Sequence, residues 1–332
     1  MEKSLRERRK ARFRVVSPQE ASTHHEKLKD VFKLITEKSS NSSDSGFSVD
    51  KETILKVFKL TNSTTKADIL ARLTLIDSMY STQMNRRYYA LDELADFLVN
   101  LSEGKDGKLK QMFLDFAKEP EEKLFLFNYV FKERNEKGEF IEVKKNLFSE
   151  NYGIGKDGSE KGIAISLISK YGYFETECKF PIYDSIACEM FPLVWICCGF
   201  DKNMPKLIRY NKDDGRIIGH TTLVEYIKAI NLLIKKLDSC YVNYDSLDYY
   251  LWSVGKICRG NLSLILSRKE YKDAVEKCPP QPIIIPQKDG SEKKVMEYFN
   301  IENIKLDKLD FLKEKPLLDE LFKLAKYYRS KK

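Results

Sequence analysis

Asp184 is the residue of this sequence best placed for chemistry. It ends the segment FPIYD and directly precedes an apolar run that begins at Ile186. Capping alone explains a single Asp at such a place, because its side chain accepts hydrogen bonds from the first N–H groups of a helix. The helix start also favours the ionised carboxylate. Such a fixed anion can stabilise positive charge that develops on a substrate, or it can activate water.

A glycine-rich turn lies upstream of Asp184. Residues 152–162 read YGIGKDGSEKG and run into the helical pattern IAISLISKYGYF. Glycine permits positive φ and close backbone approach, and consecutive N–H groups at a helix start form a concavity that accepts phosphate. Lys156 and Lys161 add positive charge. Ordinary glycine turns have the same composition, so the signal is the order: glycine turn, helix, loop, then Asp184.

The elements that would position these residues are mostly helical. Apolar residues recur every three or four positions in 50–62 and 65–80. Further helices are expected at 87–101, 107–118, 121–132, 160–173, 185–198, 221–238, 244–257, 268–277 and 305–328. Strand patterns are scarce, so the predicted fold class is mainly α. Residues 39–46 form a low-complexity linker, and the proline-rich stretch 278–294 is expected to be an irregular connection to a C-terminal helical appendage.

The composition indicates a globular protein and argues against a membrane span and a histidine-rich metal centre. The chain has 332 residues, 42% of them hydrophobic, which is enough to bury one large or two ordinary cores. No apolar stretch approaches the roughly 18 residues that span a bilayer, and no secretory signal is evident, so we expect an intracellular protein without membrane contact. The seven cysteines form no C-x-x-C pair, and three histidines cannot assemble a histidine-rich metal centre. We therefore expect neither a metal site nor a cofactor, and only a carboxylate-only Mg²⁺ site stays open.

The charge points to a polyanionic partner. The formal net charge is +8, and cations cluster at the N-terminus. The cluster consists of Lys3, Arg6, Arg8, Arg9, Lys10, Arg12 and Arg14. A basic run of this kind is typical of an arm that binds nucleic acid, and its few apolar residues would anchor a membrane-surface helix poorly.

The order of glycine turn, helix, loop and Asp184 resembles the helix-hairpin-helix (HhH-GPD) superfamily of base-excision DNA glycosylases. A second resemblance is LIDSMYSTQMNR at 75–86, which is similar to the S-x-Q segment of that superfamily, and a third is LDYYLWSVGK at 247–256 together with FPIYDS. The likeness covers roughly residues 50–260 and is greatest to a poorly characterised branch. It implies a two-lobed helical fold with a DNA cleft between the lobes.

The resemblance also implies roles for individual residues. Asp184 would be the catalytic carboxylate, Tyr183 would line the base pocket, and Gln83 would fill the gap left by an extruded base. Lys161 lies near the position where bifunctional members carry a lyase lysine, yet a monofunctional enzyme is expected. The residues expected to contact DNA are Gly153, Gly155, Lys156, Gly158, Ser159, Ser81, Gln83, Asn85, Arg86 and Arg87. The chain departs from the family in lacking an L-P-G hairpin opening and in carrying Arg86 where an acidic residue often stands.

Several side chains are given ordinary structural roles. Lys170 is expected on a solvated helix face, and Lys256 as a charge at a helix C-terminus. The aromatic residues available for stacking are Tyr88, Tyr89, Tyr183, Tyr249, Tyr250 and Trp252. At helical spacing such residues are more often core, so only Tyr183 is assigned to the pocket.

The predicted organisation has three parts: a basic arm, helix and linker at 1–46, a glycosylase-like core at 47–265, and a helical extension at 266–332. The expected partner is DNA, double-stranded rather than single-stranded, and the expected form is a monomer in the cytoplasm (nucleoid) or in a nucleus. The excised base would be a damaged base or a modified base of foreign DNA. Two alternatives stay open, a non-catalytic DNA sensor and, ranked last, a metal-dependent nuclease suggested by EVK at 142–144.

Overall fold

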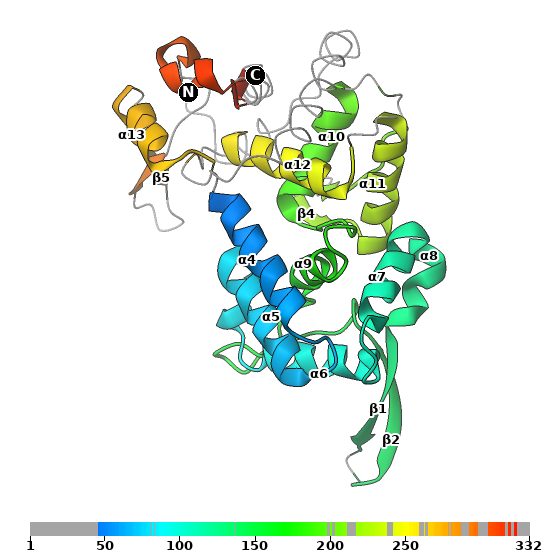
Figure 1. Cartoon of the computed structure of the whole chain (residues 1–332). Helices are drawn as coiled ribbons and strands as arrows, with labels where there is room; N and C mark the ends of the chain where they lie inside the picture. The colour runs from blue at the N-terminus through cyan, green and yellow to red at the C-terminus, as the bar shows by residue number, and fades with distance from the viewer. Residues whose placement is uncertain are drawn as a thin grey trace. The chain divides into compact units, whose positions relative to one another are not determined.

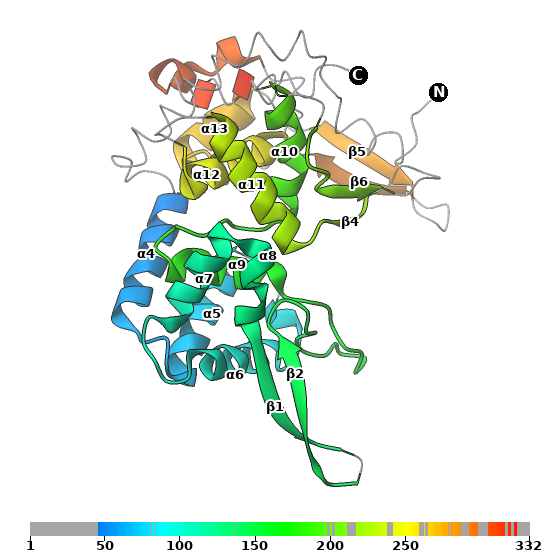
Figure 2. The ribbon, with the colours of Figure 1, turned by 90° about the vertical axis from the view of Figure 1, so that its right-hand side faces the viewer.

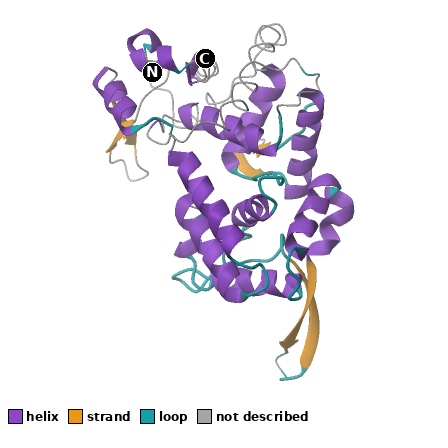
Figure 3. Cartoon of the chain, viewed as in Figure 1, coloured by secondary structure: helices purple, strands orange, loops and turns teal. Residues whose placement is uncertain are grey.

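The structure is a computed structural model and is mainly helical (Figure 3). It describes residues 46–80, 82, 84–135, 137–197, 200, 203–210, 217–237, 242–258, 262, 265–277, 279, 281–286, 292–297, 305–315, 318–319 and 322–323. The predicted basic arm and linker at 1–45 lie outside these ranges. Among the described residues, no helix is both long and apolar enough to cross a lipid bilayer.

The helices and strands are numbered as in Figure 1. The helices are α4 (Gly46–Leu60), α5 (Lys66–Tyr80), α6 (Ala90–Ser102), α7 (Lys108–Lys118), α8 (Pro120–Lys123), α9 (Ile165–Glu175), α10 (Ser185–Cys197), α11 (Leu223–Leu237), α12 (Tyr244–Cys258) and α13 (Arg268–Lys277). Short 3₁₀ turns are η1 (Met84–Arg86), η2 (Leu124–Phe127), η4 (Leu306–Lys308) and η5 (Asp310–Glu314). The strands are β1 (Asn128–Arg134), β2 (Phe140–Asn146), β3 (Ile208–Tyr210), β4 (Ile217–His220), β5 (Gln281–Pro286) and β6 (Glu292–Glu297).

The chain forms two compact units. One consists of Asp50–Asp184 and Thr222–Leu232. It is called the catalytic-candidate unit below, because it contains Asp184 and the glycine turn at 152–162. The other consists of the described residues within Ser185–Thr221 and Leu233–Lys332, together with 46–49. The boundary falls directly after Asp184. The boundaries predicted at 46 and 265 stay predictions.

The core of the catalytic-candidate unit is built around α9. Apolar side chains at helical spacing on α5, including Ile69, Leu73 and Ile76, are fully buried, and α5 contacts both α6 and α9. Gly172 of α9 allows a close approach, because an added Cβ would lie 2.5 Å from the Phe113 ring. Aromatic rings fill the layer between α7, α9 and the following loops, with members Phe113, Phe116, Phe127, Phe148, Tyr171 and Phe180.

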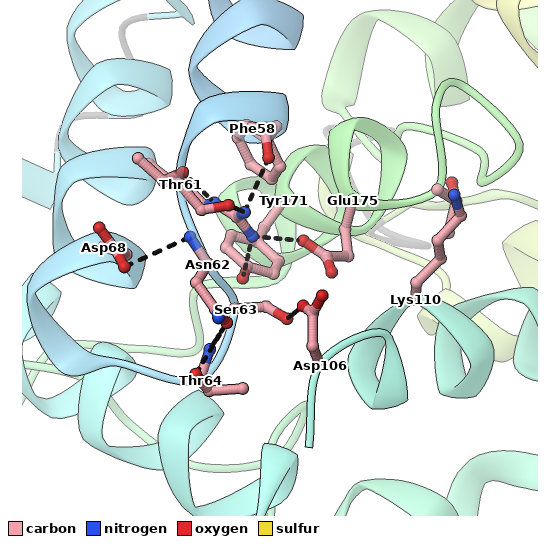
Figure 4. A network of polar contacts seen from close by, with 12 residues as sticks. Phe58, Thr61, Asn62, Ser63, Thr64, Asp68, Asp106, Lys110, Tyr171 and Glu175 are labelled. Atoms are coloured by element: carbon pink, nitrogen blue, oxygen red, sulfur yellow. Dashed lines mark hydrogen bonds and ion pairs between the residues drawn. The ribbon is translucent and has the colours of Figure 1, made fainter. Parts of the chain in front are cut away.

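A buried guanidinium ties α4 to this core. Arg72 donates from Nη2 to the carbonyls of Phe58 (2.8 Å), in the last turn of α4, and of Thr61 (2.6 Å), directly after that helix. Its Nη1 donates to Glu175 Oε2 at 2.7 Å, and both side chains are almost wholly buried. Figure 4 shows Thr61, Tyr171 and Glu175 converging at this point. The carbonyls at a helix end need such partners, so Arg72 acts as a C-terminal cap supplied by a neighbouring helix.

A two-stranded ribbon replaces one predicted helix. The prediction of a helix at 121–132 is wrong beyond α8, because β1 starts at Asn128 and pairs antiparallel with β2 from Asn128↔Asn146 to Arg134↔Phe140. The turn explains the change: Asn135 Oδ1 accepts the N–H groups of Lys137 and Glu139, both at 3.0 Å, and Gly138 has φ +79°. An Asn that bonds its own turn competes with helix formation.

The second unit rests on the packing of α10 against α12. Gly255 makes that approach close, since a Cβ there would collide with Ile186 Cγ2. Two sequence predictions in this unit are wrong. The stretch 278–294, predicted to be irregular, contains the antiparallel strands β5 and part of β6, and the predicted helix at 305–328 begins as the separate 3₁₀ turns η4 and η5.

Candidate functional site

The loop after α5 and the glycine turn are joined to each other. Tyr88 N–H donates to Ile154 O at 2.9 Å, and Ile154 N–H donates to Tyr88 O at 3.1 Å. Arg87 adds two contacts from Nη1, to Gly162 O at 2.5 Å and to Tyr152 O at 3.5 Å. Burial lowers the pKa of the Arg87 guanidinium, while the charge of Asp77 acts in the opposite sense. Two segments far apart in the sequence thus form one continuous surface element of the catalytic-candidate unit.

The glycine turn is a small hairpin between β2 and α9. Ile154 pairs with Glu160, Gly155 N–H donates to Ser159 O at 2.8 Å, and Gly158, with φ +75°, closes the turn. Asp157 accepts the hydroxyl (2.7 Å) and N–H (3.2 Å) of Ser159, which lowers its pKa to about 2. The element before this hairpin is strand β2, and helix α9 follows it. A helix-hairpin-helix unit would have a helix on both sides, so the hairpin differs from that arrangement on its first side.

Gly153 and Gly155 are required by contacts. At Gly153, φ is +75° and a Cβ would lie 2.6 Å from Ala90 Cβ and 2.7 Å from Tyr88 O. At Gly155 a Cβ would collide with the end of the Lys161 side chain. That side chain folds over the turn, with Nζ 2.8 Å from Ser159 Oγ and 3.6 Å from Asp157 Oδ1. These contacts show that Lys161 helps to shape the hairpin. Its correspondence to the lyase lysine of bifunctional glycosylases stays a prediction.

Several amides of the hairpin already have acceptors. The N–H groups involved are those of Gly153 (to Glu93 Oε2, 2.7 Å), Gly155, Gly158, Ser159 and Lys161. The next helix, α9, begins after Ala164, which supplies no side-chain cap, and Gly162 and Ile163 before it are exposed. First-turn N–H groups lack intrahelical partners. The start of α9, with the exposed Lys156 as a nearby cation along the chain, is therefore better suited to a phosphate than the turn itself.

Asp77 organises the loop that follows α5, and sequence reasoning missed it. It is buried, and its Oδ1 accepts the hydroxyl of Thr82 and the N–H of Met84 (2.9 Å). The signal in the sequence is its place four residues after Leu73, on the apolar face of α5. Ser81 and Gln83 lie outside the described residues, as does the side chain of Asn85. Their predicted contacts with DNA stay predictions.

The backbone before Asp184 is fixed on both sides. Tyr183 N–H donates to Ser169 Oγ on α9 at 3.0 Å, and the hydroxyl of the fully buried Ser169 has Ser166 O at 3.1 Å as its nearer acceptor and Tyr183 O at 3.4 Å. Tyr226 OH donates to Ile182 O at 2.8 Å, and its ring packs edge-on against Tyr183. Helix α10 begins at Ser185, so Asp184 stands where the sequence predicted, directly before a helix. Asp184 is partly exposed.

Lys170 is buried, which corrects the prediction of a solvated helix face. Its side chain is in the core of the unit, with Nζ donating to Ser166 Oγ at 2.8 Å and lying 5.7 Å from the centre of the Tyr80 ring. The ring faces of aromatic residues attract cations. Lys170 therefore links α9 to the last residue of α5, next to the loop that contains Thr82. Lys256 lies in the last turn of α12, as predicted.

The aromatic candidates divide by burial. Tyr250 is fully buried, as expected for core, whereas Tyr88 is 53% and Tyr89 68% exposed. Tyr89 also has φ +64° ahead of α6. A bulky residue in that conformation is strained, and such strain clusters at functional sites. The two tyrosines thus add a pair of exposed rings to the surface element formed by the loop and the hairpin.

No group of three or more His, Cys, Asp and Glu among the described residues could hold a metal ion. The EVK segment at 142–144 lies within β2 of the ribbon. In comparisons with known proteins, no family model, no curated protein and no solved structure matches the chain.

Proposed function

We propose that this protein is a monofunctional DNA glycosylase that hydrolyses the N-glycosidic bond of a damaged or modified base. One observation carries the proposal. Ser169 and Lys170 are consecutive on α9; the first holds Tyr183, the residue before Asp184, and the second contacts Tyr80, the residue before the S-T-Q loop. The segment before Asp184 and the end of α5, from which residues 81–83 follow, therefore contact consecutive residues of one helix.

The chemistry suits a carboxylate at this place. Cleavage of an N-glycosidic bond builds positive charge on the sugar, and a nearby anion stabilises that oxocarbenium-like state and can orient water. At an effective dielectric constant of 20, a unit pair at about 4 Å interacts by about 4 kcal/mol, which corresponds to roughly three powers of ten in rate if the interaction exists only in the transition state. In this scheme Asp184 is the catalytic residue, and Ser169 is a positioning residue.

The joined loop and hairpin support binding to duplex DNA. An enzyme that acts on a base must extrude it, fill the gap and hold the bent backbone. Tyr88, Tyr89 and Arg86 are exposed on the loop side of this element, and Lys156 is exposed on the hairpin side. Aromatic rings stack on bases and cations contact phosphates. Gln83 is the proposed wedge, with Ser81 and Asn85 beside it in the sequence.

The test is a release assay on oligonucleotides that carry a panel of damaged and modified bases, with and without EDTA, followed by mass spectrometry of free bases. Free base in the presence of EDTA supports the proposal. Metal-dependent strand breaks without a released base would identify a nuclease instead. Tight DNA binding with neither product would identify a non-catalytic DNA sensor.

A further inference from the structure

The ribbon formed by β1 and β2 has two faces of different character. Figures 1 and 2 show it projecting away from the helices of its unit. Residues paired across the ribbon share a face, and the register assigns Val130, Lys132, Arg134, Phe140, Glu142 and Lys144 to one of them. All six are exposed, including Phe140 at 68% and Val130 at 47%. This set is called the outer face below.

The inner face is anchored to the body of the unit. Phe131 packs edge-on against Phe97 of α6 with ring centres 5.0 Å apart, and it also contacts Tyr129. Lys145 lies over the Phe131 ring and pairs with Glu133 at 2.5 Å. The inner face therefore has its cation neutralised and its aromatic residues packed, so it offers little to a charged ligand.

The cations on the outer face differ from Lys145 of the inner face in their ion pairing. Lys132, Arg134 and Lys144 have no carboxylate within ion-pair distance among the described residues, and Glu142 is the one acidic residue of this face. Glu142 stands directly opposite Lys132, whereas Arg134 is opposite Phe140 and Lys144 is opposite Val130. Two cations of the outer face therefore face apolar partners, and their charges are not offset across the ribbon.

Arg134 is held in a defined orientation. Its guanidinium lies 4.9 Å from the centre of the Phe140 ring, on the strand opposite. Stacking of this kind restrains the guanidinium while leaving its N–H groups at the ring edge available as donors. Arg134 and Lys144 are four register positions apart, which corresponds to about 13 Å along the ribbon. A duplex carries about one negative charge per 3.4 Å of axis on each strand, so that length corresponds to about four phosphates of one strand.

We propose that the outer face of the ribbon binds the phosphate backbone of double-stranded DNA, with Arg134 and Lys144 as the phosphate contacts. A two-stranded ribbon is narrow enough to lie along a groove of duplex DNA. The choice of DNA as the ligand rests on the proposed function. The ribbon would add phosphate contacts on β1 and β2 to those proposed for Arg86 and Lys156.

The test compares two double variants of the full chain in duplex binding at several salt concentrations. Arg134→Gln/Lys144→Gln removes the two proposed contacts. Lys145→Gln/Lys228→Gln removes the same net charge from cations that already pair with Glu133 and Glu121. The slope of log K against log salt is negative, and each lost phosphate contact makes it less steep by about 0.9. The slope of the first variant should be less steep than that of wild type by about 1.8, so the loss of affinity from 50 to 200 mM salt shrinks about 12-fold. The control should match wild type.

The outcomes separate this proposal from the glycosylase proposal. Equal slopes for wild type and Arg134→Gln/Lys144→Gln would overturn the ribbon contact, even if the protein releases base. A reduced slope supports the ribbon contact, even if no base is released from any substrate. The third outcome is that Arg134→Gln/Lys144→Gln has the same salt slope as wild type but a different molecular mass in light scattering. That result would assign the outer face to contact with a second copy of the chain and would also overturn the proposal.

Discussion

Tyr88 and Ile154 exchange two backbone hydrogen bonds, at 2.9 and 3.1 Å, and so join the loop after α5 to the hairpin before α9. The pairing requires Gly153, because the space that a Cβ would take is occupied by Ala90 and by the carbonyl of Tyr88. A single glycine thus permits the contact on which the proposed DNA surface depends.

Gly153→Ala should destabilise the protein by at least about 1 kcal/mol more than Gly158→Ala. Both positions have φ +75°, where a non-glycine residue costs about 1–2 kcal/mol. Only Gly153 adds the collision with Ala90 and Tyr88, since nothing lies within 4 Å of a Cβ at Gly158. Urea unfolding of the two variants measures the difference. Equal free energies of unfolding would show that the loop and hairpin can separate without cost.

The adjacent arginines at 86 and 87 should separate binding from stability. Arg87→Gln removes the charged hydrogen bonds to Gly162 and Tyr152 and should cost about 1.5–3 kcal/mol of unfolding free energy. Arg86 is exposed, so Arg86→Gln should change stability by less than about 0.5 kcal/mol, while lowering the salt slope of DNA binding by about 0.9. Thermal melts and salt titrations test both. An unchanged slope for Arg86→Gln would remove that residue from the DNA surface.

Ser169→Ala should slow catalysis more than it weakens DNA binding. The variant leaves the N–H of Tyr183 without its acceptor, at a cost of about 1–3 kcal/mol, and loosens the segment that carries Asp184. We expect a lower rate constant of base release in single-turnover assays with an unchanged Kd for duplex. Ser149→Ala, at an exposed serine, is the matched control. A normal rate constant in folded Ser169→Ala would show that Ser169 has no positioning role.

The stability of the Arg72–Glu175 network should depend on pH in a specific direction. Burial raises the pKa of Glu175, although the neighbouring Arg72 acts in the opposite sense. A carboxyl with a raised folded-state pKa contributes stability that is fully present below its unfolded value and is lost as pH rises through the folded value. The Tm of wild type minus that of Glu175→Gln should therefore fall as pH rises above about 4.3. An increase with pH would show that the ion pair dominates over burial.

Helical spacing predicted α4, α5, α7, α10, α11, α12 and α13 to within a few residues. The apolar faces of α5, α7, α10, α11 and α12 are buried, which is why their spacing was informative. The ribbon was missed because Leu124, Phe125, Phe127, Val130 and Phe131 satisfy a helical pattern, and the hydrogen bonds from the side chain of Asn135 that set the turn are not visible as periodicity. The strands β5 and β6 were missed in a proline-rich stretch.

Charged residues on apolar helix faces were the signal that could have located the buried network. Arg72 lies beside Leu73 on α5, and Lys170 and Glu175 fall three and eight residues after Leu167 on α9. All three are buried in the structure. Composition and spacing cannot say which buried charge meets which partner, because Arg72 and Glu175 are far apart in the chain and meet only through the packing of α5 on α9.

The most direct test of the central claim compares wild type with Asp184→Asn on the substrate that the release assay identifies. The substitution keeps the ability to cap a helix but removes the negative charge, so we expect base release to fall by about three powers of ten while the Kd for duplex stays within a few-fold. Melting curves of both proteins establish that the Asp184→Asn variant is folded. Full base release by well-folded Asp184→Asn would contradict the assignment and leave Asp184 as a helix cap.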